Sequence, residues 1–179
     1  EYAGSITIPA SFTYNSGIYR VISIDNWAFY NCDGLTSVYV GDNVTTIGER
    51  AFDGCDGLTS VIIGNSVVSI GVEAFYDCDV LASVTIGDNV ASIGNGAFYG
   101  CRSLVSIIIP NSVTSIGDEA FFYCNGLTSV TIGNNVSSIG SKTFYNCKKD
   151  GKNLYVVEIN SADNVVYVGG QEELFVKIT

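Results

Sequence analysis

The chain has 179 residues, of which 47% are hydrophobic and 15% charged, so it can bury a core and does not have the composition of a disordered segment. The formal net charge is −10, and residues 25–147 hold twelve acidic against three basic side chains. This balance argues against nucleic acid and anionic membrane surfaces as partners, because both require Lys/Arg patches, and no apolar run approaches the roughly 20 residues of a membrane helix.

The N-terminal residues 1–23 are predicted to form a cap made of a hairpin and a partial repeat. The segment "FTYNSGIYRV" indicates two strands joined by a turn at Asn15-Ser16-Gly17. The chain begins at Glu1 without an initiator methionine or a signal-like apolar stretch. We interpret it as a processed or trimmed chain, which is compatible with secretion.

Residues 24–147 are predicted to form a solenoid. One row, "LTSVYVGDNVTTIGERAFDGC", runs from Leu35 to Cys55, and near-copies start at Leu58, Leu81, Leu104 and Leu127. The interval is 23 residues throughout, and a fixed period of this size is typical of stacked repeat units. No row can bury its own apolar face, so each needs its neighbours and both ends need caps.

Each row reads as a strand, a turn, a second short strand and a compact corner. Val38 and Val40 flank Tyr39 in a period-two pattern, and Gly41-Asp42-Asn43 supplies turn chemistry. A glycine then ends the second strand, and we expect a positive φ there; the first row has Asp25 instead, and the other positions are Gly48, Gly71, Gly94, Gly117 and Gly140. The last part, such as "ERAFDGC", predicts at most a helical or 3₁₀ turn.

Residues 148–179 are predicted to form a degenerate C-terminal repeat and a capping β-element. The segments "LYVVEI", "NVVYV" and "LFVKI" read as strands after the repeat pattern slips beyond Cys147. Five of the eight basic residues lie from Lys142 onward. Their charges would disfavour pairing between the exposed edge strand at this end and a strand of another molecule.

Two residue types recur at the repeat period and predict a structural core ladder. Free cysteine packs as a small buried hydrophobe, and equivalent thiols of stacked rows point the same way, which disfavours disulfide geometry and converging metal ligands. Disulfides and a metal or redox site are the alternatives. The ladder consists of Phe29, Phe52, Phe75, Phe98, Phe121 and Phe144 with Cys32, Cys55, Cys78, Cys101, Cys124 and Cys147.

The sequence offers little for catalysis, and we expect no enzyme, no cofactor and no metal site. The chain has no histidine, which removes the usual activation of Ser and Cys nucleophiles. "GSKT" at residues 140–143 lacks phosphate-loop spacing, and "FDGCDG" at residues 52–57 lacks the alternating acids of a calcium loop. The carboxylate pairs Asp77/Asp79 and Asp118/Glu119 occupy variable positions that we expect to be exposed.

The row pattern L-x-S-V-x-I-G-x-x-V-x-S-I-G-x-x-A-F-x-x-C resembles the BspA-like, or treponemal-type, leucine-rich repeats of bacterial surface proteins. This resemblance implies a β-rich α/β solenoid: a right-handed, curved leucine-rich repeat with a parallel β-sheet on one face and short strands or 3₁₀ turns on the other. It also implies an extracellular or cell-surface protein that acts as an adhesin or binding module.

The outward positions of the predicted sheet are the candidate partner-binding face, which we call the ladder face. They are small, uncharged and mildly apolar, which suits a flat protein or glycan, although Ser and Thr also occur on simple solvated strands. The ladder face consists of Ser37, Tyr39, Ser60, Ile62, Ser83, Thr85, Ser106, Ile108, Ser129 and Thr131. A second candidate is a ridge of Tyr30, Tyr76, Tyr99 and Tyr145.

Two functional hypotheses follow. The first is a non-enzymatic surface module that binds a protein or glycan on the ladder face. The second is a structural subunit that self-associates through the ends or sides of the solenoid, in which case deleting residues 154–179 should matter more than placing charge on the ladder face. The sequons at Asn43 and Asn135 serve as turn formers unless the host glycosylates them.

Overall fold

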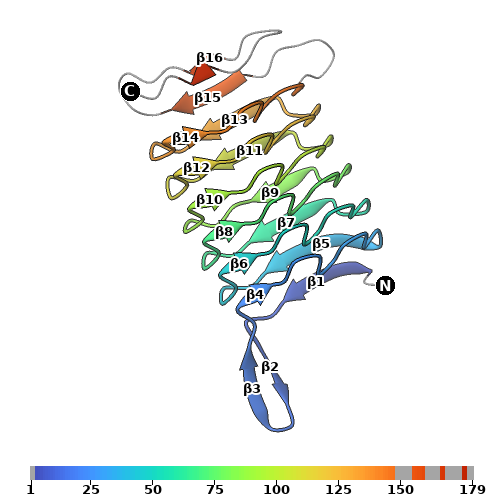
Figure 1. Ribbon diagram of the computed structural model, residues 1–179. Helices are drawn as coiled ribbons and strands as arrows, with labels where there is room; N and C mark the ends of the chain where they lie inside the picture. Colours follow the sequence, from blue (N-terminus) through green and yellow to red (C-terminus); the bar gives the residue numbers. More distant parts are fainter. Residues whose placement is uncertain (1–2, 148–154, 160–165, 168–174, 177–179) are drawn as a thin grey trace.

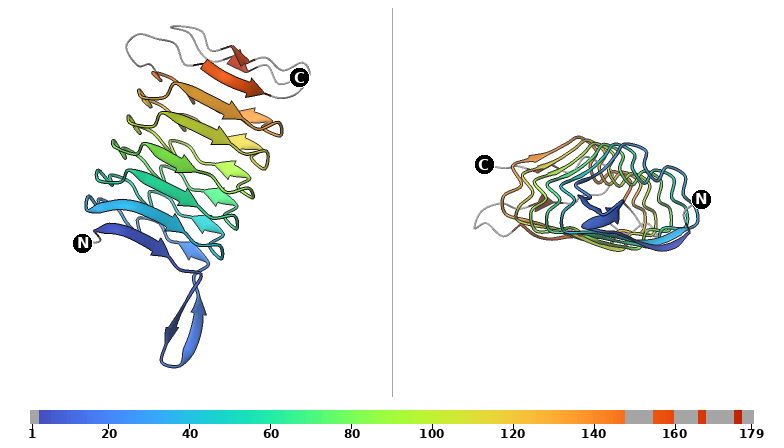
Figure 2. Two further views of the ribbon diagram at one scale, coloured as in Figure 1. Left: turned by 180° about the vertical axis from the view of Figure 1, so that it is seen from behind. Right: turned by 90° about the horizontal axis from the view of Figure 1, so that it is seen from below.

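A computed structural model describes residues 3–147, 155–159, 166–167 and 175–176. The rows stack in sequence order into a β-solenoid, with the first row at one end and the last at the other (Figure 1). The right-hand view of Figure 2, along the stack, shows successive rows with the same outline, each displaced sideways from the one before. The 23-residue sequence period is therefore one turn of the chain.

One face of the solenoid carries the longer strands, which run parallel. Equivalent residues pair across neighbouring rows, as Ser37 does with Ser60. These strands form two sheets, in the orders β1-β5-β7-β9 and β11-β13-β15, rather than one. Their bounds are β1 Gly4–Ile8, β5 Leu35–Val40, β7 Ser60–Ile63, β9 Ser83–Thr85, β11 Ser106–Ile109, β13 Ser129–Ile132 and β15 Tyr155–Ile159.

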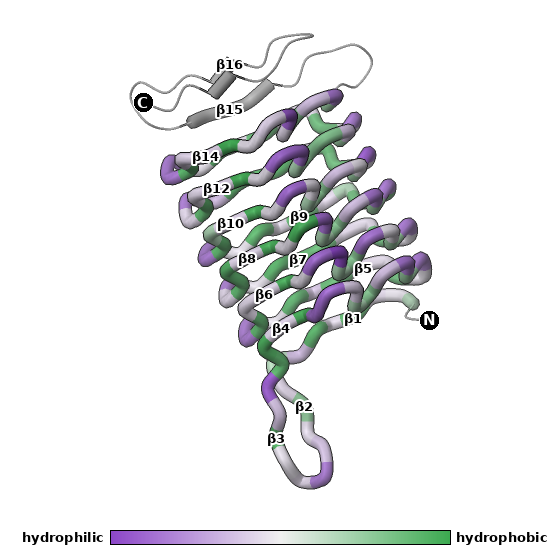
Figure 3. The backbone as a smooth tube through the Cα atoms, viewed as in Figure 1, coloured by the Kyte–Doolittle hydropathy of each residue, from purple (hydrophilic) through white to green (hydrophobic). Residues whose placement is uncertain are grey.

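The opposite side carries two-residue strands in one continuous parallel sheet of order β14-β12-β10-β8-β6-β4. Each ends in a mostly buried isoleucine that follows a Ser or Thr. Their bounds are β4 Ser23–Ile24, β6 Thr46–Ile47, β8 Ser69–Ile70, β10 Ser92–Ile93, β12 Ser115–Ile116 and β14 Ser138–Ile139. Figure 3 shows hydrophobic residues along the strands and hydrophilic ones at the turns.

The core between the two faces is built from identical residues stacked in columns. The rings of Phe52 and Phe75 lie 5.1 Å apart with planes inclined by 1°, and this parallel stack runs from Phe29 to Phe144. Phe52, Phe75, Phe98 and Phe121 are fully buried. Phe29 and Cys32, in the first row, are only partly buried, because no complete row covers them.

The hairpin predicted near the N-terminus is present. Strands β2 (Ser11–Tyr14) and β3 (Gly17–Arg20) pair antiparallel, and the turn residues Asn15 and Ser16 both have positive φ, 46° and 63°. This geometry matches the twist of a two-residue hairpin. Figures 1 and 2 show the hairpin projecting from the N-terminal end of the stack, away from the rows.

The expectation of positive φ at the row glycines is wrong. Gly94 and its equivalents do not have positive φ, and neither does Asp25. Glycine is needed there because rows approach closely: a Cβ on Gly94 would lie 2.6 Å from the carbonyl carbon of Gly71. Positive φ falls two residues later instead, as at Arg50 with 51° and Glu73 with 54°.

The corner of each row contains hydrogen-bonded turns, and no helix of any kind occurs in the described residues. The left-handed residues explain this difference from the expected helical or 3₁₀ turn. In the second row Arg50 and Gly54 both have positive φ, at 51° and 68°, so a right-handed helix cannot continue past either. No helix that could cross a membrane is present in this part of the chain.

The predicted C-terminal cap lies mostly outside the described residues. Within it the structure describes β15, which continues the ladder by pairing with β13, and the strands β16 (Val166–Tyr167) and β17 (Phe175–Val176), which pair antiparallel with each other.

Candidate functional site

The ladder face is formed by alternate residues of the longer strands. In β5, Val38 and Val40 point into the core and are 2% and 0% exposed, so Tyr39 between them points outward and is 38% exposed. The same alternation leaves Ile62 47% and Ile108 68% exposed. Large aliphatic side chains thus stand on the solvent side of two strands.

The serine and threonine positions are exposed to different degrees. Ser83, Thr85 and Ser106 are exposed, whereas Ser37, Ser60, Ser129 and Thr131 are half-buried. The serines form one column and the variable residues the other, because the rows pair in register. The structure brings all ten predicted residues onto one side of the solenoid, in two adjacent columns along its length.

Sequence reasoning missed part of this surface. β1 pairs with β5, so Ser5 and Thr7 extend the two columns by one row, and the Ser37 hydroxyl donates a hydrogen bond to that of Ser5 at 2.7 Å. The signal was present, since "SITIP" at residues 5–9 matches "SIIIP" at residues 106–110. Val105, 51% exposed, adds an apolar side chain directly before β11.

The ladder face has a seam between β9 and β11, where the two neighbouring rows do not form a sheet. In two other rows a threonine hydroxyl bonds the preceding row: Thr128 Oγ1 donates to the Val105 carbonyl oxygen at 3.1 Å and Thr59 Oγ1 to that of Thr36 at 2.8 Å, whereas Ala82 has no hydroxyl although β7 and β9 pair. Val105 has no hydroxyl with which to cross the seam. Across the seam the Ser103 amide donates to the Asp79 carbonyl oxygen at 3.1 Å, and the side chains of Arg102 and Asp79 are 2.7 Å apart.

Next to the seam lies an open hollow of about 560 Å³. It is formed where the turns following β11 and β13 meet the turn of the row before. Its lining includes Asp88, Ile108, Asn111, Thr131 and Asn134. The hollow thus combines an apolar side chain at Ile108 with amide side chains at the turns.

None of the six cysteines forms a disulfide in the described part of the chain, and five of them are buried. Each buried thiol donates a hydrogen bond to the backbone carbonyl oxygen of the phenylalanine 26 residues earlier, at 3.0–3.3 Å, as Cys101 does to Phe75 at 3.3 Å. Burial raises the pKa of the Cys101 thiol, because a thiolate would be desolvated there. The five buried thiols thus link consecutive rows, and burial favours the protonated form of Cys101.

The tyrosine ridge is also a stack. Tyr76 and Tyr99 lie 4.6 Å apart, and Phe122 and Tyr145 continue the column at 5.0 and 5.2 Å. Asp53 occupies the equivalent position in the second row and interrupts the column after Tyr30. Rings stacked face to face present mainly their edges to solvent, which leaves little ring face for a ligand.

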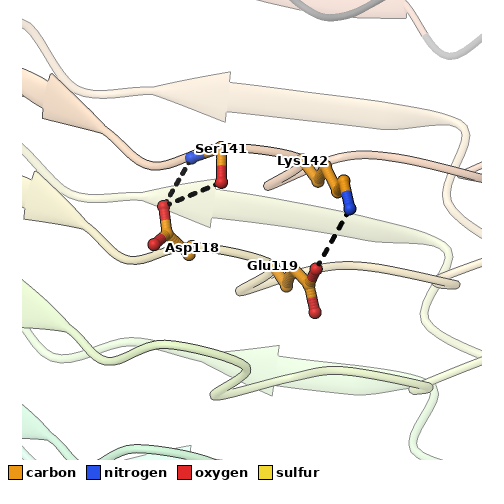
Figure 4. Close-up of polar contacts among 4 residues, drawn as sticks. All are labelled: Asp118, Glu119, Ser141 and Lys142. Atoms are coloured by element: carbon orange, nitrogen blue, oxygen red, sulfur yellow. Dashed lines mark hydrogen bonds and ion pairs between the residues drawn. The ribbon is translucent and has the colours of Figure 1, made fainter.

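The paired carboxylates form contacts between rows. Asp118 accepts hydrogen bonds from the Ser141 amide and hydroxyl, at 2.6 and 3.1 Å, and Glu119 lies 3.8 Å from the Lys142 ammonium (Figure 4). Asp77 is partly buried, and this desolvation raises the pKa of its carboxyl group.

The two sequon asparagines both use their side-chain amides within the fold. Asn43 Nδ2 donates to the Ala10 carbonyl oxygen at 3.1 Å, and Asn135 Nδ2 donates to that of Asn111 at 2.7 Å. Both amides therefore tie a turn to the preceding row, as expected of turn formers.

Comparison with known proteins gives one family and several structural relatives. The family model of the BspA type leucine rich repeat region matches residues 22–150 in six copies. No curated protein matches the chain.

Among solved structures, the chain is similar to a leucine rich cell surface protein from Faecalibacterium prausnitzii, with 34% identity over 80% of this chain and 45% of that one, and a TM-score of 0.54. A leucine-rich repeat protein from Eubacterium ventriosum is 25% identical over 84% of this chain and 41% of that one, with a TM-score of 0.68. The Treponema pallidum leucine rich repeat protein is 24% identical over 82% and 78%, with a TM-score of 0.63. The chain thus spans less than half of the first two relatives.

Proposed function

The chain belongs to the BspA-type leucine-rich repeat family, and from this premise we propose that it is a non-enzymatic binding module, secreted or displayed on a cell surface, that holds a flat partner against its ladder face. The similarity to the Faecalibacterium cell surface protein supports this location.

The observation that carries the proposal is the exposure of Ile62 and Ile108. The chain has a net charge of −10, yet the ladder face bears no charged side chain. Ile62 and Ile108 are 47% and 68% exposed on this face, so a partner that covers them removes apolar surface from water, which favours binding. Their location on β7 and β11 places one on each side of the seam.

A protein fits this chemistry better than a glycan. Protein interfaces have an apolar centre surrounded by polar groups, and here Ile62, Val105 and Ile108 are flanked by serine and threonine hydroxyls. Glycans are held mainly by polar groups, and Tyr39 is the one aromatic side chain among the ten predicted ladder-face residues. A bound glycan remains the second outcome of the test.

The test is a binding assay with a matched charge control. The double variant Ile62→Lys/Ile108→Lys places two charges on the ladder face, and Val68→Lys/Val72→Lys places the same charges on exposed valines on the side of the short strands. Purified host extracellular-matrix proteins and a glycan array serve as probes. Binding lost in the first variant and kept in the second supports the proposal, whereas equal binding by both variants refutes it.

A further inference from the structure

The β2–β3 hairpin is a separate exposed surface outside the ladder face. It forms a two-stranded sheet with no third strand among the described residues. Every residue of β2 and β3 except Gly17 is exposed, including Phe12 at 50% and Ile18 at 78%. An isolated two-stranded sheet is marginally stable in water, so a surface of this kind gains from further strands.

Among the described residues, the edge of β2 that faces away from β3 has a defined set of unpaired backbone groups. The Val21 amide donates to the Ala10 carbonyl oxygen at 3.0 Å, which fixes this pair as hydrogen-bonded. Hydrogen-bonded and non-hydrogen-bonded pairs alternate along an antiparallel ladder, so Phe12 and Tyr14 bond inward to β3. The N–H and C=O groups of Ser11 and Thr13 therefore face outward.

One face of the hairpin is aromatic. Phe12 and Tyr14 share it by strand alternation, and Tyr19 joins them because it lies directly opposite Phe12. The rings of Phe12 and Tyr19 stack at 5.5 Å. Tyr14 and Tyr19 are 63% and 50% exposed, so this face lacks a cover in the described part of the chain.

The hairpin differs from the rest of the chain in its charge. Residues 2–24 contain no acidic residue, whereas the chain as a whole holds 18. Two copies that met along their acidic rows would repel each other more strongly than two hairpins, each of which carries only the charge of Arg20. Within the hairpin, Arg20 lies on β3, and a charge on an edge strand disfavours pairing there, whereas β2 carries neither a charge nor a proline.

We propose that two copies of this chain associate through their β2 edges, in an antiparallel pairing about a two-fold axis at Thr13. The outward amide and carbonyl groups of Thr13 then bond those of Thr13 in the other copy. In the same register Phe12 of each copy lies opposite Tyr14 of the other, on one face. The result is a four-stranded sheet with a continuous aromatic face, and it requires no particular partner on the ladder face.

The first experiment measures association by sedimentation velocity over a range of protein concentrations. Thr13→Pro removes the outward N–H from the β2 edge, and Ile18→Pro removes an outward N–H from the β3 edge as a matched control. We expect a concentration-dependent dimer for the native chain and for Ile18→Pro. Thr13→Pro should weaken association by about tenfold or more, because the two-fold axis removes two hydrogen bonds at once.

The second experiment tests the register. In a hydrogen-bonded antiparallel pair the Cα atoms are about 5.5 Å apart, so Thr13→Cys should form a disulfide between copies under mild oxidation. In Ser11→Cys the new cysteines of the two copies are four residues apart along the paired strands, which separates their Cα atoms by about 14 Å, so no disulfide should form. The native chain, oxidised in the same way, shows whether its own six thiols form disulfides between copies.

A native chain that stays monomeric at the highest concentration overturns the proposal. The β2 edge would then pair with a strand of a different protein. Equal loss of the dimer in both proline variants also overturns it, since the β2 edge would then not be specific. Cross-linking of Ser11→Cys without Thr13→Cys would refute the proposed register.

Discussion

The thiol of Cys78 donates a hydrogen bond to the backbone carbonyl oxygen of Phe52, 26 residues earlier, at 3.1 Å. The same contact recurs for every buried cysteine. Cysteine combines the small apolar volume that the packed core admits with a donor for a carbonyl group that water cannot reach. This explains why a thiol, rather than a methyl group, recurs every 23 residues.

Replacing Cys101 should separate the packing role of the thiol from its role as a donor. Cys101→Ala leaves the Phe75 carbonyl oxygen without this donor and creates a small cavity, so we expect a loss of about 2 kcal/mol in the free energy of unfolding. Cys101→Ser keeps a donor and should lose less. Urea denaturation followed by circular dichroism measures both, and a serine variant less stable than the alanine variant would contradict the role of the side chain as a donor.

Gly94→Ala should destabilise the solenoid because of the contact between rows. The added Cβ would lie 2.6 Å from the Gly71 carbonyl carbon and 2.7 Å from the Val72 amide nitrogen, so the backbone must shift. We expect a cost of about 1–3 kcal/mol or more. Gly96→Asn is the control, because the equivalent positions hold Glu73 and Glu119 at similar positive φ. Thermal unfolding should show a lower Tm for Gly94→Ala alone, and equal Tm values would contradict this reason for the glycine.

Asp53→Tyr should stabilise the protein. Asp53 is only 7% exposed, and burial raises the pKa of its carboxyl group, so the ionised form costs stability at neutral pH. A tyrosine there would fill the gap in the aromatic column between Tyr30 and Tyr76 and add about 1–2 kcal/mol through two new ring contacts. Asp53→Asn removes the charge without adding a ring. Calorimetry should rank the tyrosine variant first, and a tyrosine variant no more stable than Asp53→Asn would argue against the filled column.

Alkaline pH should destabilise the fold, because Tyr76 ionises at a lower pH in the unfolded chain than in the folded one. Burial raises the pKa of Tyr76 to about 12, above its ordinary value near 10. The folded state therefore favours the neutral phenol, and this stability is complete below about pH 10 and falls as the pH rises through about 12. Tyr76→Phe should flatten the decline in denaturation experiments across that range while keeping the stack with Tyr99. An exposed tyrosine, changed in Tyr14→Phe, is the control, and an unchanged slope in Tyr76→Phe would contradict the assignment.

The repeat and the hairpin could be predicted because each depends on residues that are close in the sequence. Alternation around Tyr39 predicts a strand with one outward face, and the turn Asn15-Ser16-Gly17 predicts the hairpin. The role of Gly94 could not be predicted, since it depends on the distance to Gly71 in the previous row. Neither could the seam at Val105, which depends on pairing between rows.

The ladder face was only partly predictable for the same reason. Its ten residues follow from strand alternation, but the degree of exposure of Ile62 and Ile108 depends on how neighbouring rows cover them. The open hollow near Asn111 depends on three turns meeting in space.

The sequence by itself determined the 23-residue row, the inward phenylalanine and cysteine columns, and the family, because a period fixes which residues are equivalent and alternation fixes which way they point. Only the tertiary structure decided which positions require glycine because rows approach closely, which aromatic residues stack, and where the longer strands divide into two sheets. It also decided that one edge of β2 has no neighbouring strand in the described part of the chain. These features depend on distances between rows, which are set by the packing of whole turns against each other.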